Sequence, residues 1–99
     1  EWRDMSGYRI NRQLTEFGEH VRGWRMVLGL TAQQVSERAG ITRDTLRKIE
    51  SGNPNVSFNS VTQVLRALGI LDQLVDAADP LASDIGRLRA GRLTRKRAR

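Results

Sequence analysis

The stretch 31–52, TAQQVSERAGITRDTLRKIESG, limits what this chain can fold into more than any other part of the sequence. It has the pattern of two short helices separated by a glycine. Thr31 has a hydroxyl that can cap the first helix, and Gln34, three residues on, completes a capping box. Gly40 stands where a helix needs a left-handed C-terminal residue, and Thr42 can cap the second helix. The stretch therefore predicts two helices joined by a tight turn.

The faces of the two expected helices differ. The first carries a narrow face of small residues, which allows another helix to approach closely. The second is divided between an apolar side, which can hold it rigidly, and a polar side, which presents long hydrogen-bond donors to a partner. The small face consists of Ala32, Val35, Ser36 and Ala39, the apolar side of Thr45, Leu46 and Ile49, and the polar side of Arg43, Asp44, Arg47 and Lys48.

The polar side of the second helix has two interpretations. An α-helix fits the major groove of DNA, where arginine or lysine reaches O6 and N7 of guanine. An ordinary surface helix would carry the same charges in contact with water, and for an isolated charged face that is the more common case. The order of caps, turn and apolar side across 31–52 favours recognition of DNA.

In these residues and their spacing, the stretch resembles the helix-turn-helix of the phage-repressor, or XRE, regulators. The resemblance extends from about residue 17 to residue 74 and rests on Leu30-Thr31, Val35, Ala39-Gly40-Ile41-Thr42, Thr45-Leu46, Lys48-Ile49-Glu50 and Gly52. It implies an all-α fold: a five-helix lambda-repressor-like DNA-binding domain in 14–78, followed by a short C-terminal helix and a basic tail in 79–99. Residues 1–13 lack a sustained period and are expected to form an extended or poorly ordered arm, with Trp2 and Tyr8 docked on the body or disordered.

The resemblance also implies which residues contact DNA. The helix 42–51 would lie in the major groove. Base-reading positions fall on Arg43, Asp44 and Lys48, with Thr42 and Arg47 alongside, and backbone contacts fall on Thr31, Gln33, Ser51 and Asn53. Many members carry glutamine where this chain has Ala32, and that side chain braces the recognition helix. Gln33 is not expected to replace it, because neighbouring helical positions point about 100° apart.

A structural clamp is a further implication of the resemblance. A basic residue at the position of Arg25 pairs, in the family, with the acid that ends the recognition helix. Here that acid is Glu50. The pair would fix geometry more than it would add net stability.

Apolar residues at helical spacing predict the remaining helices. The helix that precedes the motif is expected to begin near Leu14, with Thr15 as a cap, and to bury Trp24. Ser57 is expected to cap a fourth helix that Gly69 ends, and a short fifth helix follows. The three apolar stripes are Leu14, Phe17, Val21, Trp24 and Leu28; Phe58, Val61, Leu65 and Leu68; and Ile70, Leu71, Leu74 and Val75.

The net charge of +6 is concentrated at one end of the chain. Residues 87–99 hold seven basic side chains and no acid, whereas residues 1–86 hold ten basic and eleven acidic side chains and are close to neutral. General attraction to phosphate therefore belongs to the tail. The last ten residues, AGRLTRKRAR, are expected to be disordered in isolation.

Several classes of function find no support in the sequence. With no cysteine there is neither a disulfide nor a thiolate metal site, and the one histidine, His20, is expected on the surface. No catalytic constellation, phosphate-binding glycine motif, metal site or cofactor site is present. Because no signal peptide or membrane span is recognisable, we expect a cytoplasmic protein, associated with the nucleoid through DNA and not with a membrane.

Three functions remain for comparison. The first is a sequence-specific regulator of transcription on double-stranded DNA, a repressor acting as a homodimer. The second is an antitoxin that also masks a HipA-like toxin kinase. It rests on a resemblance to HipB-type antitoxins in 50–54, Val56-Ser57, Val64-Leu65, 67–69 and Asp79-Pro80. The third, binding of single-stranded nucleic acid, needs exposed stacking aromatics, and only Trp2 and Tyr8 are candidates.

A dimer interface is expected in the C-terminal third of the chain. Asp79-Pro80 has the pattern of a helix cap with proline at the first position. The apolar residues left over for a partner are Ile70, Leu71, Leu74, Leu81, Ile85 and Leu88. These lie away from the helix 42–51, so a contact there would leave the reading faces free.

Overall fold

A computed structural model describes the backbone of residues 2–97 and the side chains of residues 7–94. The chain forms two compact units, residues 1–69 and 70–99. The first contains α1 (Trp2–Val27), α2 (Ala32–Ala39), α3 (Arg43–Glu50) and α4 (Phe58–Leu68). The second contains α5 (Leu71–Ala78), the 3₁₀ helix η1 (Pro80–Ala82), α6 (Asp84–Leu88) and α7 (Gly91–Arg97). The described residues include no strand, so the all-α prediction is confirmed.

The caps of the helix–turn–helix are those that the sequence predicts. The Thr31 hydroxyl accepts a hydrogen bond from the Gln34 N–H at 3.0 Å, and the Gln34 side chain accepts one from the Thr31 N–H at 2.9 Å. Gly40 ends α2 in the left-handed region with φ 69°. The hydroxyl of Thr42 accepts from the Thr45 N–H at 3.1 Å at the start of α3. These local bonds fix where both helices begin and how the chain turns between them.

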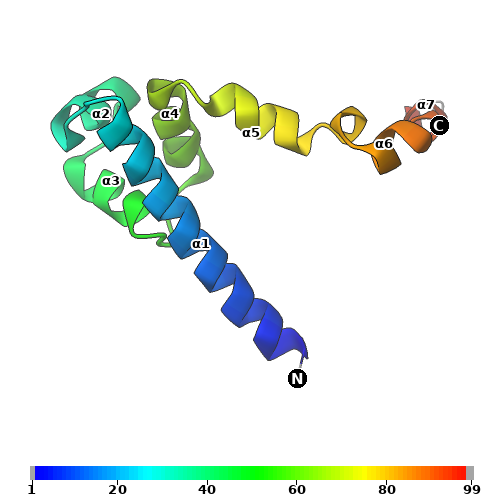
Figure 1. The fold of residues 1–99 in the computed structure, drawn as a ribbon, viewed down its shortest axis with the longest axis horizontal. Coiled ribbons are helices and arrows are strands. Elements are labelled where there is room, and N and C mark those ends of the chain that lie inside the picture. The colour runs from blue at the N-terminus through cyan, green and yellow to red at the C-terminus, as the bar shows by residue number, and fades with distance from the viewer. Residues whose placement is uncertain (1, 98–99) are drawn as a thin grey trace. The chain divides into compact units, whose positions relative to one another are not determined.

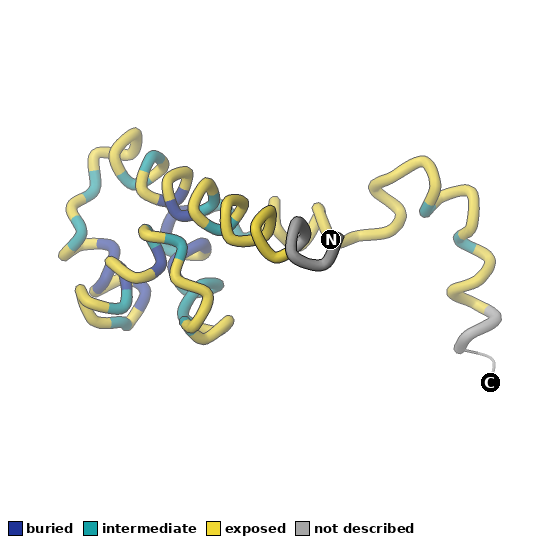
Figure 2. Tube along the Cα trace, turned by 90° about the horizontal axis from the view of Figure 1, so that it is seen from below, coloured by how far each residue is buried: buried dark blue, intermediate teal, exposed yellow. Residues whose placement is uncertain are grey.

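The core of the first unit lies where α1, α2, α3 and α4 meet (Figures 1 and 2). Its buried apolar side chains come from all four helices: Val21, Val35, Ala39, Leu46, Ile49, Val64, Leu65 and Leu68. The main packing partners are α2 with α4 and α1 with α3. Val35, Ser36 and Ala39 are buried on α2, which confirms the expected small-residue face and explains why α4 approaches it closely.

Three residues of the apolar stripes predicted for α1 and α4 are exposed. Trp24 is 42% exposed, Leu28 45% and Phe58 73%. Trp24 lies in the last turn of α1, Leu28 follows the end of that helix, and Phe58 is the first residue of α4. The spacing of apolar residues therefore predicted the buried faces of α1 and α4 but not which residues at their ends are exposed.

The N-terminal arm is helical, so the prediction of an extended arm for 1–13 is wrong for the described residues. α1 runs without interruption from Trp2, and Thr15 does not cap it. The hydroxyl of Thr15 donates to the Asn11 carbonyl at 3.1 Å, as it does inside a helix. Tyr8 is 73% exposed on this stretch; the side chain of Trp2 lies outside the described residues. Residues 7–13 are exposed, so this part of α1 continues the helix without a buried apolar stripe of its own.

The second unit consists of short helices, and side chains cap two of them, η1 and α6. The Asp79 carboxylate accepts from the Leu81 N–H at 2.9 Å, and Pro80 occupies the first position of η1, as predicted. Ser83 begins α6 by accepting from the Gly86 N–H at 3.1 Å. Residues 91–97 form α7, so the prediction of a disordered tail is wrong for that stretch. Long unbranched side chains such as arginine and lysine favour helix, which composition alone did not reveal.

The residues predicted for a dimer interface are half-buried at one end and exposed at the other. Ile70 and Leu71 are half-buried, and Leu74, Leu81, Ile85 and Leu88 are exposed at 36, 47, 58 and 85%. Within residues 2–97, no helix combines the length and the apolarity needed to cross a membrane.

Candidate nucleic-acid interface

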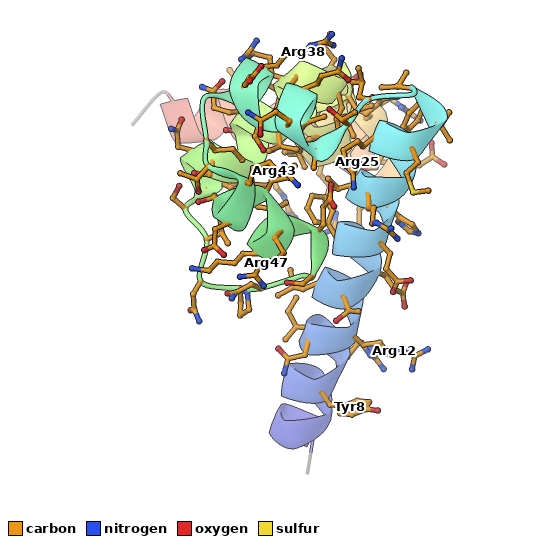
Figure 3. All side chains as sticks on the ribbon, turned by 90° about the vertical axis from the view of Figure 1, so that its left-hand side faces the viewer. Tyr8, Arg12, Arg25, Arg38, Arg43 and Arg47 are labelled. Atoms are coloured by element: carbon orange, nitrogen blue, oxygen red, sulfur yellow. The ribbon has the colours of Figure 1, made fainter. Side chains whose placement is uncertain are left out.

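Helix α3 is held by its inner side and presents its outer side to solvent. Leu46 and Ile49 are buried at 1% and 3% exposure. The outer side carries the predicted set Arg43, Asp44, Arg47 and Lys48, all of them exposed. Figure 3 shows Arg43 and Arg47 projecting from α3 in the first unit. The separation of the two sides matches the prediction and makes α3 a rigid support for long polar side chains.

The predicted clamp between α1 and the end of α3 is present. Arg25 Nε donates to Glu50 Oε2 at 2.8 Å and Arg25 Nη2 donates to Glu50 Oε1 at 3.1 Å. Nη1 also donates to the Leu30 carbonyl at 3.4 Å, in the loop before α2. The two side chains are only 14% and 11% exposed. The hydrogen bonds from Arg25 to Glu50 raise the pKa of Arg25, while burial acts against them, so this cation stays charged.

Two glycines bring the backbones of α1 and the turn after α3 into direct contact. A Cβ at Gly18 would lie 2.5 Å from the Glu50 carbonyl oxygen, and one at Gly52 would lie 2.5 Å from the Leu14 carbonyl oxygen. Gly52 also adopts a positive φ of 79°. Sequence reasoning missed the role of Gly18, for which the only signal is a glycine inside a helical stripe. Together with the clamp, this contact sets where the recognition helix ends.

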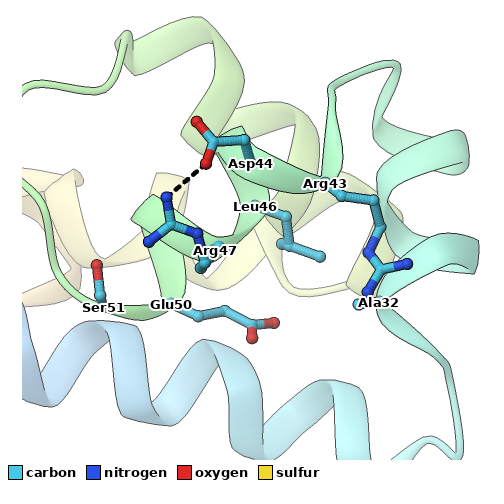
Figure 4. A pocket seen from close by; sticks show the side chains of 7 residues that line it. All are labelled: Ala32, Arg43, Asp44, Leu46, Arg47, Glu50 and Ser51. Atoms are coloured by element: carbon cyan, nitrogen blue, oxygen red, sulfur yellow. Dashed lines mark hydrogen bonds and ion pairs between the residues drawn. The ribbon is translucent and has the colours of Figure 1, made fainter.

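Asp44 organises the cations of the outer side. One of its carboxylate oxygens pairs with Arg47 Nη2, and the other lies 3.3 Å from Lys48 Nζ. Figure 4 shows the Asp44–Arg47 pair on the outer side of α3. Hydrogen bonds from Arg47 and then from Lys48 lower the pKa of Asp44. The outer side is therefore a linked group of charges around one carboxylate.

Arg43 lies apart from this group and contacts α2. Its Nη1 donates to Gln33 Oε1 at 3.4 Å, and Gln33 Nε2 donates to Glu37 Oε1 at 2.8 Å. Gln33 was not expected to brace the helix α3. It does contact that helix, because the long side chain of Arg43 reaches across to α2 and donates a hydrogen bond to Gln33. The link is exposed and longer than an ideal hydrogen bond, so it positions Arg43 only weakly.

The surface between α2 and α3 is hollowed beside Ala32. An open cavity of about 520 Å³ is lined by Ala32, Arg43, Asp44, Leu46, Arg47, Glu50 and Ser51 (Figure 4). The methyl group of Ala32 leaves this space, which a longer side chain at the first position of α2 would enter. The hollow belongs to the same face as the charged residues of α3.

The residues expected to contact the DNA backbone lie at the ends of α2 and α3 and are exposed. Thr31 and Thr42 are the two caps already described. Ser51 Oγ donates to the Lys48 carbonyl at 2.8 Å, and Asn53 Oδ1 accepts from the Asn55 N–H at 2.7 Å. Gln33 lies in the first turn of α2. The structure thus gathers the predicted set along α2, α3 and the turn after α3.

Comparison with known proteins identifies the class of this domain. Residues 16–78 match the family model described as a helix-turn-helix domain, and the chain belongs to that family. The chain is also similar to a protein of Methanothermobacter thermautotrophicus (strain ATCC 29096 / DSM 1053 / JCM 10044 / NBRC 100330 / Delta H) named "Uncharacterized HTH-type transcriptional regulator". The two are 39% identical over 49 residues, which cover 50% of this chain and 71% of the relative. No solved structure matches the chain significantly.

Proposed function

We propose that this protein is a sequence-specific regulator of transcription that binds double-stranded DNA with α3 in the major groove. The observation that carries the proposal is the two-sided α3, with Leu46 and Ile49 buried inside and a charged outer side exposed. Glu50, at the end of the helix, is clamped to Arg25 of α1. A helix held in this way can bring arginine and lysine to base edges with a fixed register. The name of its relative, a transcriptional regulator of the helix-turn-helix type, supports the same function.

In this proposal, contacts to base edges and contacts to phosphate come from different parts of the chain. Arg43, Asp44 and Lys48 read bases, while Arg47 and Thr42 contact bases or nearby phosphates. Thr31, Gln33, Ser51 and Asn53 hold the DNA backbone on either side of α3. The seven basic residues of 87–99 add affinity for any duplex, because each phosphate that is neutralised releases counterions. Affinity and specificity are therefore separable.

We further propose that the protein is a repressor that binds as a homodimer. One recognition helix offers three or four base-reading side chains, too few to select one site against genomic competition. Two-fold pairing doubles the contacts and spaces the helices by about one turn of DNA, roughly 34 Å. The exposed apolar side chains of the second unit, including Leu81, Ile85 and Leu88, suit such an interface.

A second candidate function is that of an antitoxin that also binds a HipA-like toxin kinase and represses its own operon. The same exposed apolar side chains favour a protein partner outside the DNA-reading face. A kinase-like reading frame beside the gene, and a stable complex of the two purified proteins, would support this function. Purified proteins that do not associate would exclude it for that pair.

The main proposal is tested by selecting binding sites from a random duplex library with the purified full chain. The expected result is an enriched near-palindromic sequence that binds at least about 10³-fold more tightly than a scrambled duplex at physiological salt. Equal binding to enriched and scrambled duplexes would overturn the proposal. The double variant Arg43→Ala with Lys48→Ala serves as the control, since it leaves both caps and the clamp in place.

A further inference from the structure

Asp44 lies in the first turn of α3 and is the one acid among the outer-side residues Arg43, Asp44, Arg47 and Lys48, on the face proposed to meet DNA. DNA presents phosphates along its backbone, and a carboxylate there is repelled by them. An acid in the first turn interacts favourably with the helix dipole, which explains a negative charge at this position but not its pairing with both Arg47 and Lys48. The Asp44 side chain is 57% exposed and forms ion pairs with both Arg47 and Lys48, so its role is not to pack in the core.

The geometry of the group limits what Arg47 and Lys48 can do. Each cation is paired with a different oxygen of Asp44, and all three side chains are between 48 and 70% exposed. Exposed pairs of this kind are weak, so a strong competitor can open them. A phosphate competes for the same two cations but must approach the carboxylate to reach them. The three side chains Asp44, Arg47 and Lys48 therefore disfavour binding of a DNA duplex through its phosphates alone.

A base edge offers what a phosphate does not. A carboxylate has about four acceptor positions, and Arg47 and Lys48 use one on each oxygen. In the major groove, cytosine presents an N4 amino group as a donor, whereas guanine presents only acceptors and thymine an acceptor and a methyl group. Adenine presents an N6 amino donor beside the N7 acceptor, and N7 repels a carboxylate, so cytosine is the better partner for Asp44. Cytosine can therefore fill the remaining capacity of Asp44 without displacing either cation, and the cations can extend their other donors to neighbouring guanines.

We propose that Asp44 is a specificity-determining residue: it accepts a hydrogen bond from N4 of a cytosine and holds Arg47 and Lys48 away from phosphates on other sequences. This inference rests on the proposed function, because it assigns one position of the sequence that α3 reads. Asp44 thereby lowers affinity for DNA in general and raises the ratio between the correct site and all others.

A second ion pair in the chain provides a matched control. Asp84 pairs with Arg87 on α6 with the same three-residue spacing, and both of these side chains are exposed. Asp84→Asn changes the net charge as Asp44→Asn does and removes one ion pair, while Arg87 keeps its hydrogen bond to the Leu81 carbonyl at 2.9 Å. It does so outside α3, so it separates the effect of charge from the effect of position.

The experiment compares wild type, Asp44→Asn, Asp44→Ala and Asp84→Asn by site selection, followed by titrations on selected and scrambled duplexes at several salt concentrations. Wild type should require cytosine at one position, with about a tenfold loss or more when it is replaced by guanine. Asp44→Asn should prefer adenine there, the base that asparagine pairs with, and Asp44→Ala should show no preference. Both should bind scrambled DNA about three- to tenfold more tightly, with a salt dependence steeper by about one to two phosphates.

The outcomes separate this inference from the function on which it rests. A wild type that selects no sequence overturns the proposed function and the inference together. A wild type that selects a site, with both Asp44 variants selecting the same bases, overturns the inference alone. If Asp84→Asn relaxes the cytosine preference as strongly as Asp44→Asn, the effect is one of net charge and the inference is wrong. Cooperative thermal unfolding of all four proteins, with each folded at the temperature of the titrations, shows that the comparison is between folded chains.

Discussion

At the scale of single residues, the ion pairs of α3 differ in burial and therefore in what they do. Arg25 and Glu50 meet through two hydrogen bonds in a largely covered position. The pairs made by Asp44 are exposed and open easily. The first therefore fixes the position of α3, while the second leaves the reading face adjustable when a partner approaches.

The clamp is expected to contribute to folding as a coupled pair. Arg25→Ala and Glu50→Ala should each destabilise the fold by about 1.5–3 kcal/mol, because each leaves a covered charge without its partner. The double variant should cost less than the sum of the two, with a coupling of about 0.5–3 kcal/mol in denaturant melts. Arg12→Ala, which removes an exposed pair with Glu16, is the control and should change stability little. Simple additivity would show that the clamp does not form in solution.

The pairing of Asp44 gives a pH-dependent signature. Because Arg47 and Lys48 lower its pKa in the folded state, the pairing contributes to stability above the ordinary carboxyl value of 3.8. The contribution is lost as the pH falls through the lower, folded-state pKa. An NMR titration of the Asp44 side-chain carbon should show this low midpoint, and Arg47→Ala should raise it. Arg87→Ala should leave it in place; a midpoint that ignores Arg47→Ala would contradict the pairing.

At the scale of helices, the sequence predicts boundaries better than faces. Thr31, Gly40 and Thr42 act locally, through bonds within a few residues, so their roles follow from sequence alone. Whether Trp24 or Phe58 is buried depends on which other helix covers the site, and that information lies far away in the chain. The continuation of α1 before residue 14 was missed for a related reason, since residues 7–13 are exposed and an exposed helix needs no apolar period.

The same distinction applies to the candidate site. The charged outer side of α3 was predicted from helical spacing, and the clamp was predicted from the resemblance to a known family. The pairing within the outer side and the approach of Gly18 to Glu50 were not, because they depend on side-chain rotamers and on the crossing of two backbones. A sequence pattern contains neither.

The close approach of α1 to the turn after α3 predicts opposite effects for two glycines of the same helix. Gly18→Ala should destabilise the fold by about 1–3 kcal/mol, because the new methyl group would overlap the Glu50 carbonyl. Gly23→Ala should stabilise it by about 0.5–1 kcal/mol, because nothing lies within 4 Å of the added Cβ and alanine favours helix. Thermal unfolding of the two variants measures the difference. Equal stabilisation by both would mean that α1 and the turn do not touch.

At the scale of the whole molecule, the two units carry different features. The first, residues 1–69, contains α3 and has ten basic and seven acidic side chains. The second, residues 70–99, contains exposed apolar side chains and has four acidic and seven basic residues, with all seven basic ones in 87–99. In the proposed function, sequence recognition, assembly and general attraction to DNA therefore depend on different residues.

The proposed dimer is tested by charged substitutions in the second unit. Leu74→Asp with Leu81→Asp should abolish self-association and weaken operator binding, since both side chains are at least a third exposed and outside the core of the first unit. Sedimentation of wild type and variant, with and without the selected duplex, measures the number of chains per site. One wild-type chain per duplex would exclude the dimer. A folded double variant that still dimerises would move the interface elsewhere.

The central claim, that α3 reads sequence while the tail supplies general affinity, is tested most directly by one titration series. Arg43→Ala, Lys48→Ala and a chain lacking residues 90–99 are titrated on selected and scrambled duplexes at several salt concentrations. Each α3 variant should lose about 1–3 kcal/mol of preference for the selected site. The shortened chain should bind every duplex more weakly, with a shallower salt dependence and unchanged preference. Loss of preference on removing the tail, with none on changing α3, would contradict the account.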